Sequence, residues 1–176
     1  MGRSPAGRLY ARRVLLETRR LLMRPMSPED LDEFVELHAD PEVTRFIVPF
    51  DRPEAEERLC KNDLEWQERG HGLVAVLDRE SRRFLGRAGL KHWPQFDETE
   101  LGWALRRDAW GRGYATEAAL ACAEWGLSDF DLPYLTAMIG PGNSRSIRVA
   151  ERLEMTRLRD DVVLDNPVTV YALHQA

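Results

Sequence analysis

Apolar and polar residues recur along this chain with two periods, one typical of strands and one typical of helices. A short apolar run, Arg20–Pro25, stops at a proline and predicts a first strand. A helix follows, opened by a capping Ser27 with a proline at its first position and ended at Asp40-Pro41. A second helix is predicted over Pro53–Arg69, with Gly70 as its C-terminal cap.

The middle of the chain predicts three strands, Leu73–Asp78, Phe84–Trp93 and Glu98–Arg106. Their connections are short, which favours an antiparallel meander. From Ala115 the apolar spacing becomes helical, and small residues on this helix let it pack close to a sheet. Asp131-Leu132-Pro133 ends that helix.

The last third predicts a buried strand, a helix and two further strands. These elements span Tyr134–Ile139, Ser144–Leu153, Thr156–Val163 and Val168–His174, with a turn at Asp165-Asn166-Pro167. The order is β-α-α-β-β-β-α-β-α-β-β. Strands grouped ahead of interleaved helices indicate an α/β (α+β) fold with a mixed, mostly antiparallel sheet covered by helices.

The length of 176 residues suits one domain, which we place at 15–176 after an Arg-rich, flexible N-terminal arm, 1–14. The net charge of −5 argues against nucleic acid as a partner and is compatible with cationic acceptors. Apolar runs are too short to cross a membrane. Two cysteines and four scattered histidines predict neither a disulfide framework nor a metal site, so a cytoplasmic location is expected.

The stretch 110–119, WGRGYATEAA, carries the most specific chemistry. Gly111 and Gly113 follow a strand and precede a helix, where free N–H groups and the helix dipole favour a phosphate. A dinucleotide fingerprint is excluded, because Thr116 takes the place of its last glycine and no acid ends the next strand. A Walker P-loop is absent. Glycines that merely turn the chain remain an alternative.

Two neighbouring motifs narrow the choice of ligand for the glycine turn. The strand ELGWALR, 100–106, leads into the glycine turn, and GNSRSIRVAERLEM, 142–155, follows it. Together with the segments 18–24 and 26–43, these motifs resemble the GNAT acetyltransferase superfamily, in the branch of ribosomal-protein N-terminal (RimJ/RimL-like) acetyltransferases. The resemblance covers about residues 15–175.

The resemblance implies a GNAT-like fold and an acetyl-CoA-dependent N-acetyltransferase that transfers the acetyl group directly, in a ternary complex. The glycine turn would hold the pyrophosphate, and the preceding strand would pair with the pantetheine arm. The coenzyme-binding residues carried over are Trp103, Ala104, Leu105, Gly111, Arg112, Gly113, Tyr114, Ala115, Thr116, Asn143, Ser146 and Arg148.

Glu100 is the candidate general base, because it lies on the strand that would carry the coenzyme. Strand alternation places it on the face opposite Leu101; a surface carboxylate is the alternative. Many members of the superfamily use a tyrosine as general acid, but that position is Ala150 here. Ser146 is the candidate substitute, and Tyr171 is another.

The acceptor stays open at this stage. A protein α-amine, an aminoglycoside- or polyamine-type small molecule and an amino acid all fit. Four aromatic residues are candidates to line the acceptor side, although aromatic residues are more often core: Phe46, Trp66, His92 and Trp93. A non-catalytic acyl-CoA-binding or sensing module is the competing hypothesis, and a homodimer is left open.

Overall fold

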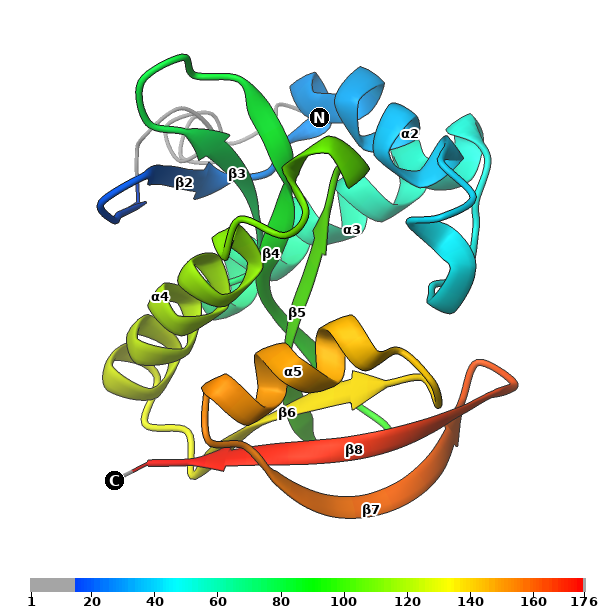
Figure 1. The fold of residues 1–176 in the computed structure, drawn as a ribbon, viewed down its shortest axis with the longest axis vertical. Helices are drawn as coiled ribbons and strands as arrows, with labels where there is room; N and C mark the ends of the chain where they lie inside the picture. Colours follow the sequence, from blue (N-terminus) through cyan, green and yellow to red (C-terminus); the bar gives the residue numbers. More distant parts are fainter. Residues whose placement is uncertain (1–14, 176) are drawn as a thin grey trace.

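The computed structural model describes residues 15–175, so the predicted arm 1–14 lies outside the described residues. One eight-stranded sheet runs through the molecule, with helices on both of its faces (Figure 1). The order of elements agrees with the order predicted from the sequence, apart from a short additional strand at the start.

The first half holds β1 (Leu16–Glu17), β2 (Leu21–Pro25), α2 (Leu31–Ala39), α3 (Arg52–Arg69), β3 (Leu73–Asp78) and β4 (Phe84–Trp93). The second half holds β5 (Glu98–Leu105), α4 (Tyr114–Asp129), β6 (Tyr134–Ile139), α5 (Ser144–Arg152), β7 (Thr156–Val163) and β8 (Asn166–His174). Three short 3₁₀ turns complete the described part: η1 (Pro28–Asp30), η2 (Thr44–Phe46) and η3 (Arg107–Ala109).

The strands lie in the order β1-β2-β3-β4-β5-β6-β8-β7. All neighbours are antiparallel except β5 and β6, which are parallel. Glu100 and Thr136 form the single aligned pair between these two strands in the described chain. Beyond that pair β5 and β6 diverge (Figure 1), so one edge of β5 lacks a ladder with β6 after Glu100.

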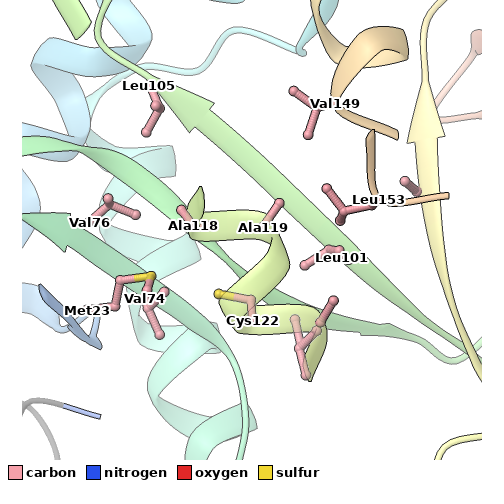
Figure 2. Close-up of a cluster of buried hydrophobic side chains, with 14 of the residues drawn as sticks. Met23, Val74, Val76, Leu101, Leu105, Ala118, Ala119, Cys122, Val149 and Leu153 are labelled. Atoms are coloured by element: carbon pink, nitrogen blue, oxygen red, sulfur yellow. The ribbon is translucent and has the colours of Figure 1, made fainter. Parts of the chain in front are cut away.

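The two faces of the sheet carry separate hydrophobic clusters. On one face α4 and α5 pack through Ala118, Ala119, Cys122, Val149 and Leu153 against inward residues of β2, β3 and β5 (Figure 2). On the other face α2 and α3 pack on smaller residues of the same strands, among them Ala75 and Ala104. Consecutive residues of β5 therefore contribute to opposite faces, as strand alternation requires.

Local sequence explains the ends of α3. Asp51 accepts the backbone N–H of Glu54 at 3.0 Å, and the Glu54 carboxylate accepts the N–H of Asp51 at 2.8 Å, which makes a capping box. Gly70 closes the helix in the left-handed region, with φ of 75°. The structure confirms this predicted cap.

The predicted turn at Asp165-Asn166-Pro167 is wrong by one to two residues. Val163 pairs directly with Asn166, so the turn is Leu164-Asp165, and both residues have positive φ. A two-residue loop with two left-handed residues matches the twist of the flanking strands. Asn166 and Pro167 instead begin β8, ahead of the residues that pair with β6, and a proline is tolerated at the start of a strand.

Candidate functional site

The glycine turn before α4 is open on the side where a ligand would approach. Gly111 and Gly113 adopt φ of 74° and 80°, in the left-handed region. A Cβ built on Gly111 would meet nothing within 4 Å. The hydroxyl oxygen of Thr116 is buried without a hydrogen-bond partner in the described chain. Free N–H groups of the first helical turn and an unpaired buried hydroxyl fit an anion such as a pyrophosphate.

A second set of residues holds the turn in place. Arg20 donates to the backbone carbonyl of Arg112 at 2.8 Å and to the Glu117 carboxylate at 2.7 Å, and its guanidinium lies 4.5 Å from the centre of the Tyr114 ring. Thr18 donates to the same carboxylate at 2.6 Å. Burial would raise the pKa of Glu117, but the hydrogen bonds from Thr18 and Arg20 outweigh it and lower that pKa. The carboxylate therefore stays charged and clamps the turn to β2.

The start of α5 reaches β5 on the α4 side of the sheet. Asn143 caps α5, and its side-chain oxygen accepts the N–H of Ser146 at 3.3 Å. The Ser146 hydroxyl accepts the indole N–H of Trp103 at 3.3 Å. Since an indole N–H can only donate, the Ser146 proton remains free to donate elsewhere. Arg145 lies over the Trp110 ring at 4.1 Å, which ties α5 to the glycine turn.

The last residues of β5 are bound on one edge only. Ala104 pairs with Arg87 of β4, and Leu105 pairs with Gly86. The Leu105 carbonyl also accepts the indole N–H of Trp110 at 2.8 Å. The opposite edge of β5 faces the divergence from β6, where an extended ligand can add main-chain hydrogen bonds.

Glu100 lies where β5 and β6 part, on the α2/α3 face of the sheet. Its carboxylate accepts the indole N–H of Trp93 at 2.7 Å and the backbone N–H of Met138. Burial raises the pKa of Glu100, and Lys91 and Arg87 oppose that shift. A carboxylate has room for about four hydrogen bonds, so acceptor capacity remains for an incoming amine.

Cationic side chains surround Glu100 on the same face. Lys91 is its direct cross-strand partner, and the Lys91 ammonium lies 3.9 Å from the centre of the Trp93 ring. Arg87 donates to Nε2 of His38 at 3.4 Å. Burial is the main cause that lowers the pKa of Arg87 to about 10 and that of His38 to about 3, so His38 is neutral.

Three residues that were candidates for the acceptor side or for the general acid do not face Glu100. Trp66 stacks on Trp125 at 5.7 Å and donates to the Leu73 carbonyl, which makes it a packing residue. His92 lies 3.8 Å from Asp97, and strand alternation directs it away from the Glu100 face. Tyr171 packs against the α4/α5 cluster.

The remaining predicted positions are compatible with the expected layout. Ala150 is fully buried in the core beneath α5, and Arg148 is exposed on that helix. Trp93 contacts Glu100 directly. Phe46, in the segment between α2 and α3, packs beside Gly140, directly after β6. This segment therefore reaches from the α2/α3 side to the end of β6, where β6 has diverged from β5.

Sequence reasoning missed the cations Arg58, Arg87 and Lys91. A signal was present in β4, where Arg87, Gly89 and Lys91 alternate with apolar Ala88 and Leu90. That alternation indicates a polar face on a central strand, which is unusual unless the face carries chemistry. Within residues 15–175, no helix is long and apolar enough to cross a membrane, and no group of acidic, histidine or cysteine side chains is arranged for a metal.

Comparisons with known proteins identify the class. Residues 20–156 match the model of the acetyltransferase (GNAT) domain. YkkB, an uncharacterised protein of Bacillus subtilis, is 32% identical over 89% of this chain and 93% of its own length. An uncharacterised N-acetyltransferase of Bacillus licheniformis, p20, is 31% identical over 82% of this chain and 85% of its own.

Solved structures agree. An acetyltransferase from Agrobacterium tumefaciens superposes with a TM-score of 0.82 at 34% identity, covering 91% of this chain and 94% of its own. RimL, a ribosomal-protein α-N-acetyltransferase solved with coenzyme A, has the same fold, with a TM-score of 0.77 at 15% identity over 92% of this chain and 98% of its own. The chain belongs to the GNAT acetyltransferase family. It is an N-acetyltransferase, and acetyl-CoA is its co-substrate.

Proposed function

We propose that this enzyme transfers the acetyl group of acetyl-CoA directly to a primary amine, in a ternary complex assembled where β5 and β6 diverge. The observation that carries the proposal is the juxtaposition on one strand of two features. The open end of β5 leads into a glycine turn with an unpaired buried Thr116 hydroxyl, and the half-buried carboxylate of Glu100 lies at the point of divergence. Acyl donor and amine would meet along this strand.

The coenzyme would bind through the residues predicted from the sequence. N–H groups at 112–116 would hold the pyrophosphate, and the Thr116 hydroxyl would gain its missing partner. The free edge of Trp103, Ala104 and Leu105 would hydrogen-bond to the pantetheine arm. Acetyl-CoA supplies an activated thioester when it is bound.

Glu100 would act as the general base. The neutral amine attacks the acetyl carbonyl carbon, a C–N bond forms and the C–S bond breaks. The proton lost by the amine goes to the Glu100 carboxylate, directly or through water. The raised pKa of Glu100 makes it a better proton acceptor than an exposed glutamate.

Ser146 would act as the general acid by donating its hydroxyl proton toward the leaving thiolate while it takes a proton back from solvent water. Its hydroxyl already accepts from Trp103, so its own proton is available for donation. Trp103 and Glu100 project to opposite faces of β5, and the acid and base would therefore act from opposite sides of the transferring group.

The coenzyme assignment is tested with Gly113→Val. This residue has φ of 80° and caps α4, and a β-branched side chain both strains that conformation and blocks the approach of a phosphate. We expect loss of CoA binding by calorimetry of at least about tenfold, with the far-UV circular dichroism of the wild type. Wild-type affinity in the variant would refute the assignment.

The base assignment is tested with Glu100→Gln. The carboxylate of Glu100 must be ionised to accept a proton. The acetyl-transfer rate of the wild-type enzyme should therefore rise with pH through the raised pKa of Glu100. In the Glu100→Gln variant this rise of the rate with pH should disappear. Its kcat should fall by about 10²–10⁴-fold, with little change in CoA affinity. An unchanged profile would remove Glu100 from the mechanism.

The hypothesis that competes from the sequence, a non-catalytic acyl-CoA sensor, rests on the buried Ala150 at the usual position of the acid, and membership of an N-acetyltransferase family disfavours it. Release of free thiol from acetyl-CoA with a panel of amines separates the two candidates. Binding of acetyl-CoA without release above background by any amine would favour the sensor.

A further inference from the structure

Three cations gather on the α2/α3 face of the sheet around Glu100, and Glu65 of α3 also acts electrostatically on one of them, Lys91. Arg58 of α3 lies 4.6 Å from the centre of the Phe50 ring, and Arg87 and Lys91 project from β4 beside Glu100. The Phe50 ring packs 4.3 Å from the ring of His38, which accepts from Arg87, so Arg58 and Arg87 lie on either side of these two rings, and Arg58 acts electrostatically on both Arg87 and Lys91. Within residues 15–175 none of the three cations makes an ion pair with Glu100 or any other carboxylate.

Arg87 is the most unusual of these cations. Its one hydrogen bond in the described chain goes to the neutral His38 ring, and burial opposes its charge. Arg87 is half-buried, and even partial burial of a guanidinium without an anion costs free energy that a ligand carrying an anion would offset. Gly102, the next inward residue of β5 after Glu100, leaves space for it. A Cβ at Gly102 would meet only the Arg87 guanidinium, at 3.9 Å.

We propose that the acceptor of this enzyme is a free amino acid, whose carboxylate binds Arg87 and Arg58 while its amine faces Glu100. This inference rests on the proposed function and specifies its substrate. Planar guanidinium groups suit a carboxylate because they can donate two parallel hydrogen bonds to it. The net charge of the whole chain is negative, but the charges around the base have the opposite sign.

The spacing of the charges favours an anion on the same small molecule as the amine. Lys91 lies directly opposite Glu100, where Cβ atoms of an antiparallel pair are about 4.5–5.5 Å apart. The Arg87 guanidinium lies over Gly102. Gly102 is two residues from Glu100, so the two backbone positions are roughly 7 Å apart along β5. An amine and a carboxylate separated by one or two carbons fit between these groups.

The test compares matched acceptors that differ only in the carboxylate: leucine, leucinamide and 3-methylbutylamine. Acetylation is followed by thiol release and by mass spectrometry of the product. Rates are expressed per neutral amine, because removing the carboxylate changes the pKa of the amine. We expect kcat/KM for leucine to exceed that for either analogue by about 10- to 100-fold, mainly through KM.

The variants Arg58→Met and Arg87→Met should each reduce this preference by about tenfold or more, by raising KM for the carboxylate acceptor. Arg58 is included because removing the half-buried Arg87 can perturb folding. Lys61→Met is the matched control: Lys61 lies three residues after Arg58 on α3, is exposed and pairs with Glu57 at 2.5 Å. It should keep the wild-type preference.

Each outcome is decisive. Acetylation of all three acceptors with a ratio near one would overturn the inference and leave the proposed function intact. A preference for leucine that survives both arginine substitutions would also overturn it. If no amine is acetylated although acetyl-CoA binds, the proposed function fails, and the inference fails with it.

Discussion

Acidification from about pH 7 to about pH 5 should lower the stability of the folded protein, with His38 as one identifiable cause. His38 is buried between α2 and the sheet, with exposure of 3%. Its Nδ1 bonds the Phe34 carbonyl at 2.9 Å, and its ring packs 4.3 Å from that of Phe50. Burial, followed by the charges of Arg87 and Arg58, lowers the pKa of His38 from 6.5 to about 3.

The magnitude follows from linkage. An unfolded histidine takes up a proton below about pH 6.5, whereas folded His38 stays neutral until about pH 3. The contribution of neutral His38 to stability is therefore fully present above the pKa of the unfolded histidine and is lost as the pH falls below that value. Integration from about pH 7 to about pH 5 gives a loss of about 2 kcal/mol from this residue. For a chain of this size that corresponds to roughly 4–8 °C in Tm.

Other buried groups contribute as well. The pKa of His71 is lowered to about 4, mainly by burial. Acidification over the same range therefore costs a similar amount of folding stability through His71. Glu65 and Glu100 act in the opposite direction, because burial raises their pKa values. The difference between the wild type and His38→Gln cancels these shared contributions.

The assay is urea unfolding followed by tryptophan fluorescence at several pH values. The free energy of unfolding of His38→Gln should fall by about 2 kcal/mol less than that of the wild type between about pH 7 and about pH 5. His174→Gln, at an exposed histidine near the end of β8, is the control and should follow the wild-type curve. Parallel pH curves for the wild type and His38→Gln would refute the argument.

Two further predictions concern the helices. Glu154 closes α5 with φ of 60° in a Schellman arrangement, in which Met155 N–H bonds the Ala150 carbonyl at 3.0 Å, so Glu154→Gly should raise the free energy of unfolding by about 1 kcal/mol. The same change at helical Glu151 should lower it by about 1 kcal/mol, and equal effects in urea melts would contradict this reasoning. Cys60 is exposed, whereas burial raises the pKa of Cys122 to about 12, so a thiol reagent should label Cys60 in the native protein and Cys122 only after unfolding. Rapid labelling of both cysteines in the native state would refute it.

The fold was largely predictable because local signals and periodicity agreed along most of the chain. The bounds of β3, β4 and β6 match the predicted strands, and α3 begins one residue before its predicted start. The errors fall where the signal is short or depends on partners. β1 has two residues, which is too few for a periodic pattern, and the Leu164-Asp165 turn takes left-handed conformations that its sequence does not favour.

The site was predictable only in part. Motifs placed the glycine turn, Glu100 and the Asn143 cap, because each is a local pattern. Links between distant segments left no such pattern: Arg20 bonds Glu117 across 97 residues, and the Arg58 cluster depends on how α3 packs on the sheet. Sequence reasoning therefore supplied more candidate residues for the proposed coenzyme side than for the proposed acceptor side.

The central claim is that an acetyl group passes from acetyl-CoA at the glycine turn to an amine at Glu100. The most direct measurement uses acetyl-CoA with an isotope-labelled acetyl group and follows the label by mass spectrometry, with leucine as acceptor. We expect label on the amine nitrogen in a one-to-one ratio with free CoA. We also expect loss of that transfer in Glu100→Gln while CoA still binds. Binding of acetyl-CoA by the wild type with no label on any amine, or full transfer by Glu100→Gln, would contradict it.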